Sequence, residues 1–343
     1  MTKERKSLII IISILAVLFC GIAIWQNNNA VSSAETSFFA MDTVMSIKAT
    51  GVKAENAVKE AEEAVYELEN KLSVTNENSA VFALNKDKNG ALDDDLLFLF
   101  DKSSYVNKET DGAFNICIYP IMKEWGFTQG EYKVPSEGKL KDLCALVNSS
   151  SFTLDSNKKT VALSNDAMID FGGIAKGYAT KVIVDILKDN GIESALINLG
   201  GNVYALGAKS NGSNYNIAIQ NPDSSKGYLG TIKVKDKAVI TSGGYERYFE
   251  EDGTIYHHII DPSTGYPAHS GAASVTVVTK DPTLGDALST AIYVMGLDKS
   301  LEYWRNSPDE FDFIFYDEEG NLFVTEGLEH AFKSENNFKV LEK

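Results

Sequence analysis

The chain has 343 residues, of which 44% are hydrophobic, and a formal net charge of −16. This length allows one large domain or two moderate ones, and the hydrophobic content excludes an intrinsically disordered protein. So acidic a chain also argues against nucleic acid as the main partner, because few cations remain to neutralise phosphates along a surface. The three cysteines, Cys20, Cys117 and Cys144, form no CxxC pair and predict neither a disulfide framework nor a zinc site.

Residues 1–26 predict an export signal or a membrane anchor. Lys3, Arg5 and Lys6 precede a run over 7–25 that contains no charged residue. A basic start followed by an apolar run is the pattern of both kinds of segment. The run is long enough to cross a bilayer, which favours an anchor that is retained.

A lipid anchor is the alternative to a transmembrane helix. Cys20 lies inside the apolar run, where a bacterial lipoprotein carries its acylated cysteine, but Phe19 occupies the place where a small residue is usual. Under either reading, the positive-inside rule predicts a cell-membrane protein whose main body lies on the extracytoplasmic side. Residues 27–37, rich in Asn, Ser and Ala, are predicted to be a tether, and residues 38–343 form the domain.

Strands and helices alternate irregularly in the domain, which predicts an α+β fold. Apolar residues three and four positions apart predict helices over 54–72 and 93–108, and Asp281 with Pro282 opens another that runs to about residue 295. Short apolar or alternating runs predict strands over 38–50, 162–169, 195–199, 203–208, 215–220, 229–234, 238–241, 255–260 and 273–279. Hairpins are expected over 151–163 and after Phe311.

The segment Asp170–Ala179 is the centre of the predicted site. A strand ends on Asp170, Gly172 and Gly173 turn the chain, and a helix begins with Lys176 in its first turns. Glycines let backbone N–H groups approach a ligand, and a helix N-terminus attracts anions, so the pattern fits a phosphate cradle with a cation beside it. A tight turn that uses glycine for geometry alone fits this segment equally well.

Two further groups carry possible chemistry. Asp286 and Thr290 stand four residues apart on one helical face, and their oxygens are ligands that Mg²⁺ accepts. Taken alone, the pair fits a partly solvated face better, with Thr290 bonded back to its own turn. His257 and His258 point in opposite directions along a strand, and either is a candidate general base or a surface histidine.

Taken together, the spaced motifs resemble the ApbE family, the FAD:protein FMN transferases. The resemblance covers nearly the whole chain after the tether. It implies an α+β fold related to the T-fold, with mixed sheets and packed helices. The motifs are Met41-Asp42-Thr43, Asp111-Gly112-Ala113-Phe114-Asn115, Asp170 to Ala179, Ile197 to Asn202, Thr241-Ser242-Gly243, His258 to Gly265 and Asp286 to Thr290.

The resemblance implies an Mg²⁺-dependent enzyme that takes FAD as substrate. Such enzymes pass FMN to a threonine or serine hydroxyl of an acceptor flavoprotein and release AMP. It implies Asp286, Thr290 and the backbone carbonyl of Gly173 as magnesium ligands, and His258 as the base. The implied FAD contacts are Met41, Ala113, Phe114, Asn115, Asp170, Lys176 and Ile259.

The chain departs from the family pattern at two places. Thr75 stands where relatives often have an aromatic residue that stacks on a ring, and Asp42 replaces the usual glycine of Met-Gly-Thr. Two other functions stay open: an FAD pyrophosphatase, in which water replaces the acceptor hydroxyl, and an extracytoplasmic flavin-binding lipoprotein without turnover. The segment Asp286–Ala291 also resembles a flavinylation target, but its expected place inside a helix favours the metal site.

Overall fold

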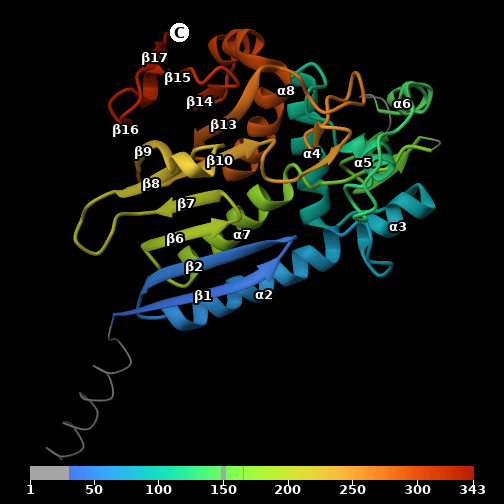
Figure 1. Cartoon of the computed structure of the whole chain (residues 1–343). Coiled ribbons are helices and arrows are strands. Elements are labelled where there is room, and N and C mark those ends of the chain that lie inside the picture. The colour runs from blue at the N-terminus through green and yellow to red at the C-terminus, as the bar shows by residue number, and fades with distance from the viewer. Residues whose placement is uncertain (1–30, 148–151, 165) are drawn as a thin grey trace, which may run out of the picture.

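A nine-stranded sheet forms the centre of the computed structural model, which describes residues 31–147, 152–164 and 166–343 (Figure 1). Its neighbouring strands are antiparallel except for the last pair, which is parallel. In spatial order the strands are β1 (Ser32–Ala40), β2 (Thr43–Gly51), β6 (Ser194–Leu199), β7 (Asn202–Leu206), β10 (Lys237–Gly243), β13 (Ala272–Thr279), β14 (Phe311–Asp317), β15 (Leu322–Thr325) and β17 (Phe338–Leu341).

Three long helices cover one face of this sheet: α2 (Ala54–Leu72), α7 (Ala175–Asp189) and α8 (Pro282–Asn306) (Figure 1). Alternate strand residues, such as Ile47 and Ile240, pack with these helices in the main core. The residues between them, such as Val239, face a second core beneath a small sheet on the other side. This small sheet consists of β8 (Tyr215–Gln220), β9 (Tyr228–Val234) and β16 (Phe332–Lys333).

The remaining helices and short strands gather at one end of the helical layer. The helices there are α3 (Ala80–Asp87), α4 (Asp94–Glu109), α5 (Tyr119–Trp125) and α6 (Glu137–Cys144). The strands are β3 (Asn89–Ala91), β4 (Phe152–Asp155) and β5 (Thr160–Leu163), together with the hairpin of β11 (Tyr248–Glu251) and β12 (Thr254–His257). Trp125, Phe127 and Ile260 belong to a third core that joins α5 and α6 to the segment after β12.

The α+β prediction is confirmed, and so is the apolar stripe of α2, whose buried residues recur every three or four positions. The predicted helix after Asp281 is confirmed, and its expected end at about residue 295 coincides with a kink at Gly296, where φ is 74°. Beyond this kink a second helical stretch carries α8 on to Asn306. The first turns of α8 are buried on all sides between the sheet, α7 and α4, so they lack a polar stripe.

The predicted tether over 27–37 is partly wrong. Residues 32–37 belong to β1, which pairs along its whole length with β2 around a turn at Met41 and Asp42. The strand over 38–50 is therefore a hairpin. β1 is the edge strand of the sheet, and an edge strand tolerates the alternating polar residues that resembled a tether.

Two other predicted strands end early. Strand β5 stops at Leu163 and β12 stops at His257, so Ala167 to Asp170 and Ile259 lie outside the sheets, and the Ala167 N–H donates to the Ser164 carbonyl in a turn. Among the residues that the structure describes, no helix is both long and apolar enough to cross a bilayer. The predicted membrane segment over 1–26 lies outside that described part of the chain.

Candidate functional site

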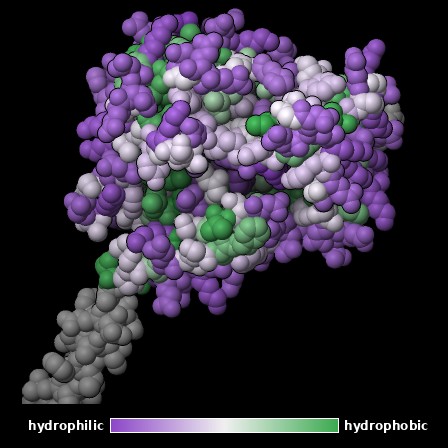
Figure 2. Space-filling model, viewed as in Figure 1, coloured by the Kyte–Doolittle hydropathy of each residue, from purple (hydrophilic) through white to green (hydrophobic). Residues whose placement is uncertain are grey.

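Two adjoining cavities open where the turns of several elements meet. The smaller has a volume of about 160 Å³ and the larger about 840 Å³, and they share wall residues including Asp170, Lys176, Glu246 and His258. The larger cavity is bordered by Met41 and Asp42, and Figure 2 shows the surface hollowed beside the turn that joins β1 to β2.

Every residue predicted to bind FAD, the metal or the acceptor proton lines one of these cavities. Met41 lines the larger cavity, and Thr75, the position that departs from the family pattern, lies there too. The remaining predicted residues line the smaller cavity: Ala113, Phe114, Asn115, Asp170, Gly173, Lys176, His258, Ile259, Asp286 and Thr290. Residues from distant parts of the chain thus converge on one site.

The turn after Asp170 is held without sheet pairing. The buried side chain of Asn85 bonds both backbone groups of Ile169, accepting from its N–H at 2.7 Å and donating to its carbonyl at 2.8 Å. The Asp170 N–H donates to the carbonyl of Ile116, and Asp170 Oδ1 accepts from the N–H of Gly172 at 2.8 Å. The side-chain amide of Asn85 therefore makes the hydrogen bonds to Ile169 that a neighbouring strand would make in a sheet.

Glycine brings α7 and α8 unusually close together. The Gly177 N–H donates to Asp286 Oδ2 at 2.8 Å. A Cβ atom at residue 177 would lie 2.3 Å from the carbonyl oxygen of Pro282 and 2.6 Å from Asp286 Cβ. At Gly173, an added Cβ would lie 3.8 Å from Thr290 Oγ1, so the glycine turn and the α8 face adjoin. The Gly177 N–H therefore bonds to a carboxylate and is not available to bind a phosphate.

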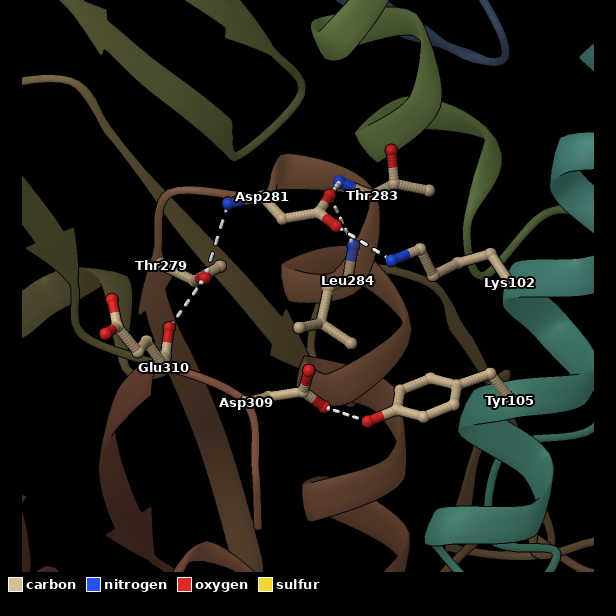
Figure 3. Close-up of polar contacts among 8 residues, drawn as sticks. All are labelled: Lys102, Tyr105, Thr279, Asp281, Thr283, Leu284, Asp309 and Glu310. Atoms are coloured by element: carbon tan, nitrogen blue, oxygen red, sulfur yellow. Dashed lines mark hydrogen bonds and ion pairs between the residues drawn. The ribbon is translucent and has the colours of Figure 1, made fainter.

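The start of α8 is fixed by its N-cap and by α4 (Figure 3). Asp281 Oδ1 accepts from the N–H groups of Thr283 at 2.9 Å and Leu284 at 3.1 Å, while its Oδ2 pairs with Lys102 Nζ at 2.9 Å. One α4 turn further on, the Tyr105 hydroxyl donates to Asp309 Oδ2 at 2.7 Å. The cap and the Lys102 pair fix the first turn of α8, directly before Asp286, and the Tyr105 bond holds the segment that follows the helix.

The carboxylates that line the cavity, of which Asp286 is buried, give the site a strong demand for positive charge. Burial raises the pKa of Asp286, opposed mainly by Lys176, and burial raises the pKa of Asp170, opposed mainly by the Gly172 N–H. Burial also raises the pKa of Glu246 to about 7, with Lys176 opposing this and Asp286 adding to it. A cation bound among these groups would offset the cost of removing their charges from water and would reduce their mutual repulsion.

The donor set suits a hard cation. Among the described residues, no group of three or more His, Cys, Asp or Glu side chains is arranged to hold a metal. A metal here would therefore combine the Asp286 carboxylate with the Thr290 hydroxyl and the Gly173 carbonyl, which are oxygen ligands of the kind Mg²⁺ prefers. Asp286 is only 4% exposed, so this is not the solvated helical face considered above.

Burial keeps both strand-end histidines neutral. It lowers the pKa of His257 to about 4 and that of His258 to about 3, where the Arg247 cation adds to the effect. His258 Nδ1 lies 3.1 Å from the carbonyl oxygen of Arg247. A carbonyl oxygen only accepts, so the proton of the neutral ring is assigned to Nδ1, which leaves Nε2 as a proton acceptor. Only His258 of the two lines the cavities.

Some wall residues had no predicted role. Asn202, Ser242, Glu246 and Arg247 all line the smaller cavity. Asn202 and Ser242 belong to motifs that the sequence displayed, Asn-Leu-Gly-Gly-Asn and Thr-Ser-Gly, whereas Glu246 and Arg247 carry no signal beyond following the second motif.

Within the segment Asp286–Ala291, the Ser289 hydroxyl is not accessible as a flavinylation target. The segment lies within α8, and Ser289 is fully buried, with its hydroxyl 2.8 Å from that of Ser242 and donating to the Asp286 carbonyl. A hydroxyl in this setting cannot meet an incoming flavin, whereas it braces the turn that carries Asp286.

The family model, the sequence relatives and the solved structures similar to this chain all point to one family. The sequence model of the ApbE family matches residues 41–315. A FAD:protein FMN transferase of Treponema pallidum is 32% identical over 330 residues, which cover 89% of this chain and 91% of that protein. The crystal structure of the ApbE protein of Thermotoga maritima superposes with a TM-score of 0.82 at 31% identity, covering 88% of this chain and all of the other. The apo flavinyl transferase ApbE of Pseudomonas stutzeri gives 0.78 at 28% identity, covering 88% and 97%.

Proposed function

The chain belongs to the ApbE family and is a flavin transferase, and from this premise we propose that it moves FMN from FAD to a threonine or serine hydroxyl of an acceptor flavoprotein, with Mg²⁺ bound and AMP released. One observation carries the proposal: the Asp170 turn, Lys176 and Asp286 line a single cavity, and α7 bonds directly to Asp286. A carboxylate, a lysine and a glycine turn together suit a pyrophosphate held with a divalent cation.

In this proposal, Asp286, Thr290 and the Gly173 carbonyl hold Mg²⁺, and Lys176 neutralises further phosphate charge. When bound, the cation would neutralise the pyrophosphate and make AMP a better leaving group. An acidic protein can then bind an anionic substrate, because positive charge lies between the buried carboxylates and the phosphates. The flavin and adenosine parts contact Met41 and wall residues of the smaller cavity, namely Ala113, Phe114, Asn115, Asp170 and Ile259.

His258 is the proposed proton acceptor. The acceptor hydroxyl oxygen bonds to the FMN phosphorus, the bond from that phosphorus to the AMP oxygen breaks, and the hydroxyl proton passes to His258 Nε2. Its Nδ1–H, held by the Arg247 carbonyl, fixes the ring and leaves Nε2 free. The low pKa of His258 keeps the ring unprotonated at neutral pH, and phosphate charge nearby would raise its basicity.

We further propose that the enzyme works at the cell membrane on its extracytoplasmic face, with an acceptor attached to the same membrane. The basic and apolar residues of 1–26 support this proposal. Mass spectrometry of the mature N-terminus separates the two anchors, because lipidation gives an acylated Cys20 and a helical anchor leaves Met1 in place. A mature protein that lacks both Cys20 and Met1 would contradict membrane attachment.

The test of function is incubation with FAD, Mg²⁺ and an acceptor domain. We expect the acceptor to gain the mass of FMN and AMP to appear in equal amount, and we expect Asp286→Ala to remove both. Free FMN with AMP, formed at the same rate without acceptor, would favour the FAD pyrophosphatase. Tight FAD binding with no AMP would favour the flavin-binding lipoprotein. A His258→Ala variant with unchanged turnover would place the base elsewhere.

A further inference from the structure

The side chain of Asn202 is a buried amide without a defined role in the proposed reaction. Asn202 begins β7, is 2% exposed and lines the smaller cavity together with Asp286. Among the described residues, no contact to its Nδ2 has the geometry of a hydrogen bond. Buried amide donors are nearly always paired in folded proteins, so an unpaired one beside a binding site calls for a functional explanation.

The acceptor that the Asn202 amide influences is the Asp286 carboxylate. The Asn202 amide is close enough to lower the pKa of Asp286, although no full hydrogen bond is made. On another side, the Gly177 N–H already donates to Asp286 Oδ2. The carboxylate is thus approached by one donor from helix α7 and by a second, still unpaired donor from the central sheet.

The backbone that presents this amide is rigid. Asn202 pairs with Leu199 across the β6–β7 turn and with Ile240 on β10, so it lies inside the sheet rather than at its edge. The turn before it uses Gly200 with a φ of 60°, and a Cβ atom there would lie 2.3 Å from Thr43 Oγ1 on β2. Strand pairing on both sides, and a turn packed against β2, leave the side chain few positions other than towards α8.

We propose that Asn202 is a positioning residue for the metal-binding carboxylate, whose amide N–H closes onto Asp286 when a divalent cation binds and holds that carboxylate in its ligating orientation. This inference rests on the proposed role of Asp286 as a metal ligand. Ligating carboxylates are generally oriented by such outer hydrogen bonds. It also gives a role to the Asn-Leu-Gly-Gly-Asn motif, because the two glycines form the turn that sets the position of Asn202.

The test measures Mn²⁺ binding to the full-length protein by electron paramagnetic resonance. Binding is measured first without nucleotide and then with saturating ADP. We expect Asn202→Ala to weaken Mn²⁺ binding by about 10- to 100-fold. The Mg²⁺ concentration that gives half-maximal transfer should rise by a similar factor, while the transfer rate at saturating Mg²⁺ and the KM for FAD stay near wild type. Asn216→Ala, on an exposed position of β8, is the matched control and should change neither quantity.

Asn202→Ser keeps a polar atom on the strand and provides a second variant if alanine impairs folding; it too should weaken Mn²⁺ binding. Wild-type Mn²⁺ affinity in the folded variants under both conditions would overturn the inference. So would a raised KM for FAD with unchanged Mn²⁺ affinity, because the amide would then contact the substrate. If the wild-type protein itself binds no Mn²⁺ and transfers no flavin, it is the proposed function that fails.

Discussion

The backbone N–H of Gly177 donates to Asp286 Oδ2 at 2.8 Å, which joins the first turn of α7 to the second turn of α8. The contact depends on glycine, since a Cβ atom would lie 2.3 Å from the Pro282 carbonyl oxygen. Two segments more than one hundred residues apart in the sequence thereby share one carboxylate. The site is built on helix packing as much as on the side chains that line it.

Gly177→Ala should therefore destabilise the protein and disturb the site together. The added methyl group forces α7 away from α8, and overpacking of this kind typically costs about 1–3 kcal/mol in the free energy of unfolding. Urea unfolding measures that loss, and Mg²⁺-dependent transfer measures the displacement of Asp286. Gly138→Ala on α6 is the control, because a Cβ there meets nothing within 4 Å. Equal stability of the Gly177 variant and wild type would show that the two helices do not meet in this way.

Asp286→Asn should separate stability from activity. The substitution keeps the size of the side chain but removes a charge whose burial raises its pKa, so the metal-free protein should be at least as stable as wild type at neutral pH. Transfer should fall by more than about 100-fold, since altering a mere neighbour of a metal ligand already costs about 10- to 100-fold. Chemical unfolding without metal and flavin-transfer assays with Mg²⁺ provide the two measurements. A variant that is both less stable and fully active would contradict both parts.

Much of this site was predictable because its residues occur in short motifs of recognisable spacing. The (i, i+4) spacing of Asp286 and Thr290, and the N-cap Asp281 before them, place both side chains on one face of a helix. The placement of Lys176 at a helix start follows from the glycines before it. Local sequence was sufficient to place these side chains, whereas their proposed roles came from the order of the motifs along the chain and its resemblance to the family.

Other features depend on tertiary contacts that no local pattern reveals. The β1–β2 turn places Met41 and Asp42 at φ values of 47° and 60°. Glycine or asparagine usually indicates this conformation in a sequence, and neither is present here. The buried first turns of α8 have no amphipathic stripe to recognise. Asn85, which replaces strand pairing before Asp170, lies 84 positions away from Ile169 in the chain. Glu246 gains its importance only from the cavity around it.

The α8 cap shown in Figure 3 gives a prediction about two weaker contacts. Asp281→Ala removes an N-cap that accepts two backbone N–H groups, and should cost about 0.5–2 kcal/mol of unfolding free energy. Lys102→Met removes a partly exposed ion pair and should cost less than about 1 kcal/mol. A double-mutant cycle by urea unfolding should give a coupling energy below about 1 kcal/mol. A much larger coupling would mean that the ion pair, rather than the backbone cap, fixes the start of α8.

Glu246 makes the stability of the metal-free protein depend on pH. Burial raises its pKa from 4.5 to about 7 on folding, so between these two values the folded state holds a proton that the unfolded state has lost. The free energy of unfolding contributed by this group must therefore fall as pH rises from about 4.5 to about 7, and stay level above that. His257 and His258, whose pKa values burial lowers, act in the opposite sense below pH 6.5.

Glu246→Gln isolates this contribution, because the histidines are common to both proteins. The stability of the variant relative to wild type should increase between pH 5 and pH 8, by less than about 1 kcal/mol, because Glu246 is exposed enough for solvent to screen its charge. Urea unfolding at unit steps of pH, without divalent metal, measures the difference. Adding Mg²⁺ should reduce it, since a cation in the cavity favours the ionised carboxylate. Parallel stability curves for the two proteins across this range would mean that folding leaves the pKa of Glu246 unchanged.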